Sequence, residues 1–120
     1  MILELVTFTS PAGWDRAKTL EDAKHVVPKW VANTDLVRKH FLRGIDGSGG
    51  ADGTGAGVYI WPSIAAAQRA HNAEWQDSVK KRTGGYATIR YFDLMLRVDN
   101  EHGTVTEWDA NGQPRELETA

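Results

Sequence analysis

The sequence predicts an α+β domain whose strands and helices follow in the order βαββαβ. Two observations carry this prediction. In two stretches apolar residues recur at spacings of three and four, which is typical of helices that pack one face on a sheet. Around these stretches lie runs of apolar and β-branched residues, bounded by glycine, proline or asparagine, which is typical of strands. The 120 residues, 41% hydrophobic and 25% charged, fit one globular domain.

The first half of the chain supplies a strand, a helix and a second strand. Residues 2–9 are apolar and β-branched, and a turn sequence with proline and glycine follows them. Residues 14–33 are predicted to be mostly helical, with a kink or a break into two short helices at Pro28. Residues 36–45 form the second strand, and its charged side chains predict a position at the edge of the sheet.

The second half repeats the pattern after a glycine-rich segment. Residues 46–56 predict a mobile hairpin loop that can act as a lid over a pocket. A third strand covers 57–61, one helix runs from Ile64 to about Arg82 and stops at a glycine pair, and a fourth strand covers 88–98. The order is that of a ferredoxin-like domain with an antiparallel four-stranded sheet over residues 1–100.

Residues 101–120 differ from this pattern and have no place in a four-stranded sheet. Asn111-Gly112 is a strong turn signal, so a small hairpin is one expectation. The alternatives are a tail that packs on a partner subunit and a tail that is mobile. The strands of the main domain look apolar on both faces while two helices can cover only one, which predicts a homodimer.

Composition excludes several classes of function. A net charge of −2 offers no electrostatic footprint for nucleic acid or acidic membranes. The sequence has no cysteine, which excludes disulfides, thiolate catalysis and cysteine-bound metals. The N-terminus lacks a basic region, Glu4 interrupts its apolar run, and no segment has membrane-spanning length. We therefore expect a cytoplasmic protein.

The best candidate for chemistry is His71, on the apolar stripe of the second helix with Ala67, Trp75 and Val79. A neutral imidazole in a half-buried cavity can act as a general base or donate to a developing oxyanion. The alternative is a core histidine that bonds a backbone carbonyl among aromatic side chains. The spacing of His71 and Glu74 resembles a di-iron motif, but it occurs once, so no metal site is predicted.

Other side chains complete the predicted site. Asn72 and Tyr86 are the candidates for donating a hydrogen bond to a substrate oxygen, and with His71 they form the predicted catalytic set. Aromatic walls for a planar ligand and two polar strand residues that can reach a carboxylate or phenolate form the predicted substrate-binding set. These are Tyr59, Trp61, Trp75, Trp30, His40 and Arg43. For His40 and Arg43 the alternative is a solvated position on the edge strand.

Several segments of the chain resemble a known family. The strand Gly57-Val-Tyr-Ile-Trp61 with the following Ala70-His-Asn-Ala-Glu-Trp75, together with residues 36–43 and 93–100, resembles the monooxygenase group of the dimeric α/β-barrel superfamily, which is related to antibiotic-biosynthesis monooxygenases. The resemblance covers about residues 2–100. It implies a homodimer whose two sheets face each other, with a cleft in each monomer. The superfamily also includes isomerases, cyclases and haem-degrading enzymes.

From these residues and this resemblance we expect a cofactor-independent, monooxygenase-like enzyme. It would deprotonate an aromatic, polyketide-like or otherwise enolisable small molecule, with His71 as base, and let the carbanion react with O₂. A cyclase or isomerase that uses the same base without O₂ is the first alternative. A dimeric small-molecule binding protein without catalysis is the second.

Overall fold

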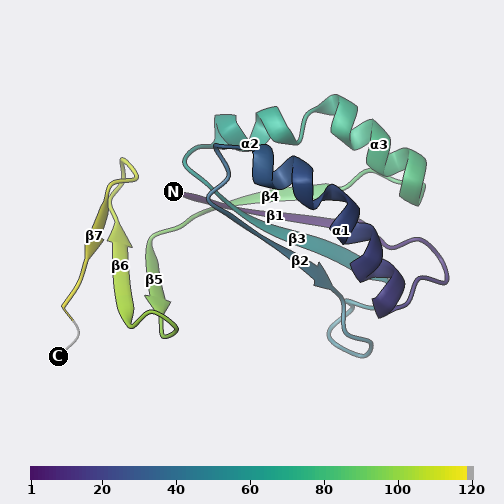
Figure 1. Cartoon of the computed structure of the whole chain (residues 1–120), viewed down its shortest axis with the longest axis horizontal. Coiled ribbons are helices and arrows are strands. Elements are labelled where there is room, and N and C mark those ends of the chain that lie inside the picture. The colour runs from purple at the N-terminus through teal and green to yellow at the C-terminus, as the bar shows by residue number, and fades with distance from the viewer. Residues whose placement is uncertain (119–120) are drawn as a thin grey trace.

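The computed structural model describes residues 1–118 and shows an α+β protein with two separate antiparallel sheets (Figure 1). The larger sheet has four strands in the spatial order β2-β3-β1-β4. Its strands are β1 (Ile2–Thr9), β2 (Arg38–Arg43), β3 (Thr54–Trp61) and β4 (Thr88–Asp93). All their pairings are antiparallel, and the arrangement is compatible with the predicted ferredoxin-like fold. β2 lies at an edge of the sheet, as its charged residues predict.

Three helices lie on one face of this sheet: α1 (Arg16–Ala32), α2 (Ile64–Ala70) and α3 (Ala73–Thr83) (Figure 1). α1 continues through Pro28, so the predicted break into two helices is wrong. Proline removes one hydrogen bond from a helix, and the residues after it still form the turn that buries Trp30 against the sheet.

The single helix predicted for residues 64–82 is also wrong, because it is divided at His71 and Asn72. His71 leaves the helical conformation, with φ −111° and ψ 57°, although its N–H still donates to the carbonyl of Ala67. Asn72 then begins α3, because its side chain accepts a hydrogen bond from the N–H of Trp75 at 3.0 Å. Gly84, with φ +88°, ends α3 as the sequence predicts.

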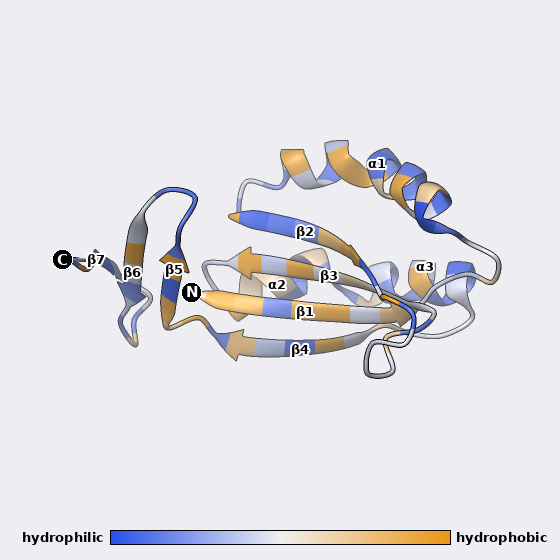
Figure 2. Cartoon of the chain, turned by 90° about the horizontal axis from the view of Figure 1, so that it is seen from below, coloured by the Kyte–Doolittle hydropathy of each residue, from blue (hydrophilic) through white to orange (hydrophobic). Residues whose placement is uncertain are grey.

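The register of the strands divides the side chains of the larger sheet between two faces. One row across the helix-covered face holds Lys39, Tyr59, Glu4 and Tyr91, which are successive cross-strand partners on β2, β3, β1 and β4. The opposite face carries apolar side chains between basic ones and has no helix over it (Figure 2). Its residues include Leu3, Leu5, Val58, Ile60, Phe92, Arg38, His40 and Arg90.

The smaller sheet comprises β5 (Leu96–Asp99), β6 (Thr104–Trp108) and β7 (Pro114–Glu116) and stands beside the end of the larger one (Figures 1 and 2). The strand predicted for 88–98 is therefore wrong as one unit: it ends at Asp93, and Leu96–Asp99 pairs with β6 instead. The predicted turn at Asn111-Gly112 does join two paired strands. The guanidinium of Arg97 lies 5.4 Å from the Trp108 ring and donates to Thr106 at 3.1 Å, so this sheet has a small polar core of its own.

The glycine-rich segment between β2 and β3 is shorter than predicted, because Thr54–Ala56 belong to β3. Backbone bonds close it, and the N–H of Ser10 ties it to the end of β1 through the carbonyl of Gly53 at 2.8 Å. The mobility predicted for this segment stays a prediction. Within residues 1–118, none of the helices combines the length and apolar character that a membrane crossing requires.

Candidate functional site

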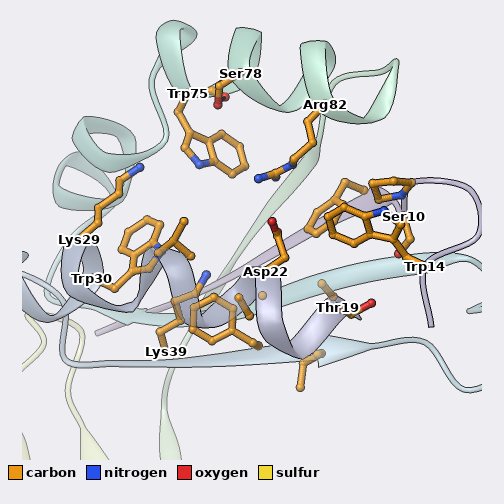
Figure 3. A pocket seen from close by; sticks show the side chains of 18 of the residues that line it. Ser10, Trp14, Thr19, Asp22, Lys29, Trp30, Lys39, Trp75, Ser78 and Arg82 are labelled. Atoms are coloured by element: carbon orange, nitrogen blue, oxygen red, sulfur yellow. Dashed lines mark hydrogen bonds between the residues drawn. The ribbon is translucent and has the colours of Figure 1, made fainter. Parts of the chain in front are cut away.

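A cleft of about 180 Å³ opens between α1 and α3, above the larger sheet (Figure 3). Aromatic side chains form much of its wall, and three cationic groups and one carboxylate also face it. From α1 it is lined by Thr19, Asp22, Ala23, Val26, Lys29 and Trp30, and from α3 by Trp75, Ser78 and Arg82. The sheet and the turn after β1 add Phe8, Ser10, Pro11, Trp14, Lys39, Phe41, Leu42, Ala56, Gly57 and Tyr59.

Two glycines of β3 shape the floor of the cleft. A Cβ atom on Gly57 would lie 2.8 Å from Cε1 of Tyr59, so the Tyr59 ring lies over the bare backbone of Gly57. In the same way, a Cβ on Gly55 would lie 2.5 Å from the ring of Phe8, its cross-strand partner. Both rings lie flat across positions without a side chain, and this leaves open space above them.

Lys39 brings an amine into this aromatic cleft. Its Nζ lies 3.8 Å from the ring centre of Tyr59, 4.1 Å from that of Phe41 and 4.6 Å from that of Trp30. It also donates a hydrogen bond to the Tyr59 hydroxyl. Burial lowers the pKa of Lys39 to about 7; the negative charge of Glu4 opposes this shift and Lys29 adds to it. Near neutral pH a substantial fraction of this amine is therefore uncharged.

Tyr59 links the cleft to the interior of the protein. Its side chain is almost fully buried, and burial, followed by the charge of Glu4, raises its pKa above the ordinary value, while Arg82 acts in the opposite direction. The phenol therefore stays protonated at every pH at which the protein works and can donate a hydrogen bond.

Arg82 and Asp22 face the cleft from opposite walls (Figure 3). The Cζ atom of Arg82 lies 5.9 Å from the ring centre of Phe8. Within residues 1–118 neither residue forms an ion pair, whereas Arg69 and Arg115 each do. With Lys29 and Lys39 also present, positive groups outnumber negative ones in this cleft.

A second polar group, the buried pair of Glu4 and His71, lies behind the cleft wall. Both side chains are fully inaccessible, and Nδ1 of His71 lies 2.7 Å from Oε1 of Glu4, without the alignment of a hydrogen bond. The indole N–H of Trp61 donates to the same oxygen at 2.9 Å. Oε2 of Glu4 and Nε2 of His71 have no hydrogen-bond partner within residues 1–118.

Four aromatic rings surround His71 and separate the buried pair from the cleft. Their centres lie 4.4 Å (Trp75), 4.5 Å (Tyr59), 5.4 Å (Trp30) and 6.3 Å (Trp61) from that of the imidazole. Neither Glu4 nor His71 lines the cleft. The inward orientation predicted for His71 is thus confirmed, but it faces a carboxylate and not the open space.

The structure brings three of the predicted substrate-binding residues together: Trp30, Tyr59 and Trp75 line the cleft. Trp61 is fully buried beside Glu4 and does not line it. Arg43 is exposed at the end of β2 outside the lining, and His40 lies on the opposite face of the sheet, as Val58 does in its register.

Two predicted catalytic residues lie outside the cleft. Asn72 is exposed, and its side chain caps α3. Tyr86 is 57% exposed, with Nζ of Lys80 at 4.7 Å from its ring centre. Capping of α3 explains the position of Asn72, and the contact with Lys80 at the surface explains that of Tyr86.

Sequence reasoning missed Lys39, Arg82 and Glu4. Lys39 is one of three basic residues in an edge strand, and only its alternation with Arg38 could have placed it on the helix side. Arg82 ends a helix, where basic residues are common for electrostatic reasons. Glu4 interrupts an alternating strand pattern, and such a residue ordinarily faces solvent.

Within residues 1–118, no group of three or more histidine, aspartate or glutamate side chains is placed to share a metal ion. Comparison of the sequence with protein-family models and with curated proteins found no match to either. The family resemblance and the activity that it implies therefore stay predictions.

Proposed function

We propose that the chain is a monooxygenase-like enzyme that deprotonates an aromatic or enolisable small molecule in the cleft, with Lys39 as the general base. The observation that supports this proposal is the position of the Lys39 amine. It lies among three aromatic rings at the floor of an open cleft, hydrogen-bonded to Tyr59, and forms no ion pair within the described chain. The role of base predicted for His71 needs contact with the cleft, so the proposal gives that role to Lys39.

The amine is suited to this role because its pKa is close to neutral pH. General bases work best when their pKa lies close to the working pH, and burial lowers that of Lys39 to about 7. A planar substrate would lie between the indole of Trp30 on α1 and that of Trp75 on α3 (Figure 3). The Tyr59 hydroxyl could then donate to the oxygen that gains charge as the enolate forms.

Reaction with O₂ would follow from this carbanion. The enolate carbon bonds to one oxygen atom, and protonation gives a hydroperoxide. Loss of water across the O–O bond, with removal of the second proton from the same carbon, leaves a carbonyl group. A CH₂ group and O₂ thus become a C=O group and water, and the substrate supplies all four electrons. A cyclase or isomerase would share only the first proton transfer.

Proton transfer can be tested with 2-tetralone, a bicyclic ketone with acidic protons at C1. We expect the protein to accelerate exchange of these protons for deuterium in D₂O, followed by NMR. Lys39→Met should reduce the rate by about 10²–10⁴, which is typical of the loss of a general base. Arg38→Met is the matched control, because Arg38 precedes Lys39 on β2 and lies on the other face of the sheet.

The outcomes separate the alternatives. Exchange with O₂ uptake at an oxygen electrode supports the monooxygenase reaction, and exchange without O₂ uptake supports a cyclase or isomerase. Binding of 2-tetralone without accelerated exchange would leave a binding protein. Equal exchange rates for Lys39→Met and Arg38→Met would exclude Lys39 as the base.

We also propose that two copies associate through the uncovered face of the larger sheet. Leu3, Leu5 and Phe92 lie there beside basic residues, and burial of apolar side chains drives association. The smaller sheet supplies complementary charge: Glu101, Asp109, Glu116 and Glu118 are exposed on its strands and connections, whereas Glu107 already pairs with Arg115. Light scattering should give twice the mass of one chain, and Leu5→Lys should yield monomers, whereas Lys24→Glu on exposed α1 should not. A wild-type monomer would contradict this proposal.

A further inference from the structure

We propose that the substrate carries a carboxylate beside its aromatic ring and that Arg82 binds this carboxylate at the mouth of the cleft. This inference rests on the proposed function, because it takes the cleft between α1 and α3 as the substrate site. It adds the chemical class of the substrate and a residue that selects it.

Arg82 is placed to receive an anion. It belongs to the last turn of α3, and its side chain extends into the cleft toward Asp22 (Figure 3). Its guanidinium lies over the Phe8 ring and has no carboxylate partner within residues 1–118. The planar guanidinium can hold both oxygens of a carboxylate at once, and it remains charged at any working pH.

The other cations of the cleft are less suited to this contact. Lys39 is enclosed by three rings and already bonds Tyr59. Lys29 lies 5.0 Å from the ring centre of Trp30, and its ammonium is a point charge without the fork geometry of arginine. Both nevertheless add positive potential to the cleft, and this attracts anions.

Asp22 determines where in the cleft the anion can lie. It is the one carboxylate among the lining residues and projects from α1, opposite Arg82. A substrate carboxylate is therefore favoured on the α3 side, next to Arg82, and repelled from the α1 side. With the ring between Trp30 and Trp75, this orientation leaves the amine of Lys39 at the floor to take the proton.

The test compares 2-naphthoate with 2-naphthamide, a neutral analogue of nearly the same shape, by isothermal titration calorimetry. We expect 2-naphthoate to bind about 10- to 100-fold more tightly, the range for a charged hydrogen-bonded contact. Arg82→Gln should remove this preference and leave the affinity for 2-naphthamide unchanged. Asp22→Asn should increase the affinity for 2-naphthoate, because a repelling charge is lost.

Two control variants make the test specific. Lys81→Gln removes a positive charge from the neighbouring position of α3, which does not line the cleft, and should keep the preference. Arg82→Lys should keep only part of the preference for 2-naphthoate, because one ammonium group cannot bind both carboxylate oxygens side by side as a guanidinium can.

Equal affinity of the wild-type protein for the two ligands would overturn the inference and leave the cleft as an aromatic binding site. A preference that survives Arg82→Gln, or weaker naphthoate binding by Asp22→Asn, would also overturn it. Failure of both ligands to bind would refute the proposed function together with this inference.

Discussion

Lys39 and Glu4 lie in the same row across one face of the sheet, on either side of Tyr59, yet their surroundings differ. Glu4 has a histidine at 2.7 Å and an indole donor at 2.9 Å, and both it and His71 are fully enclosed. Lys39 has aromatic rings and a phenol around it, and it borders open space. Burial of a polar group therefore does not by itself bring it to the cleft, and of these two residues only Lys39 borders the open space.

The largest expected effect comes from His71→Ala. The substitution leaves the buried Glu4 side chain without its neighbour at 2.7 Å and opens a cavity, which should cost about 2–5 kcal/mol of folding free energy. Urea unfolding should show this loss, while the folded fraction should bind 2-naphthoate with unchanged affinity. Glu4→Gln in the same chain should recover part of the stability, because an amide costs less to bury without a partner than a carboxyl group does. Weaker binding by folded His71→Ala protein would mean that the buried pair takes part in the cleft after all.

Lys39→Met should change stability in a pH-dependent way. Burial lowers the pKa of Lys39 in the folded protein to about 7 from its ordinary value of 10.5, so between these values the unfolded chain binds more protons than the folded one. Wild-type stability therefore rises with pH through this window, and at pH 6 the folded protein bears the full cost of the buried charge. Lys39→Met should thus be more stable than wild type at pH 6, with the difference shrinking toward pH 9.5. Urea midpoints at both pH values measure it, and a constant difference would contradict the assigned cause.

Gly57→Ala should deform the cleft floor at moderate cost. The new methyl group would lie 2.8 Å from the Tyr59 ring, which must move and thereby disturb the bond with Lys39. Overpacking of this kind typically costs about 1–3 kcal/mol, and binding of 2-naphthoate should weaken. Gly85→Ala is the control, because nothing lies within 4 Å of its Cβ position and its φ is not positive. Comparable losses in the two variants would show that the floor has no special role.

The smallest expected effects come from substitutions of Trp61, which is buried beside Glu4, and Trp75, which borders the cleft. Trp61→Phe removes the donor to Glu4 and should cost about 1–3 kcal/mol of stability, with little change in ligand affinity. Trp75→Phe should lower ligand affinity with little change in stability, because the Trp75 ring borders the cleft and is only half-buried. Urea unfolding should show the larger loss of stability for Trp61→Phe, and calorimetry the larger loss of ligand affinity for Trp75→Phe. Equal losses of stability and affinity in the two variants would contradict this prediction.

The sequence was sufficient for the order of the main strands, the edge position of β2 and the inward position of His71, because each depends on local periodicity and turn residues. It was insufficient where tertiary contacts decide. Residues 64–83 keep one apolar stripe, yet the approach of His71 to Glu4 accompanies a break that the stripe cannot reveal. Residues 88–98 carry apolar side chains on both faces, and the division at Asp93 depends on pairing with β6.

The candidate site, too, could be predicted where the local sequence decides and not where tertiary contacts do. The sequence pointed to Trp30, Tyr59 and Trp75, because aromatic rings can form flat apolar walls for a planar ligand. Lys39 and Arg82 were hidden because basic residues on an edge strand and at a helix end are ordinary. Only the three-dimensional arrangement of α1, α3 and β2 shows that these two enter one cleft.

The break between α2 and α3 has a mechanical consequence. It places a two-residue joint at the base of one cleft wall, and His71 in that joint is held to the central strand through Glu4. α3 carries Trp75 and Arg82, whereas the opposite wall belongs to α1. Because α3 also buries Val79 and bonds the backbone of Ala87 through the Gln76 side chain at 3.0 and 2.8 Å, this wall of the cleft is attached to the rest of the domain both before and after Trp75.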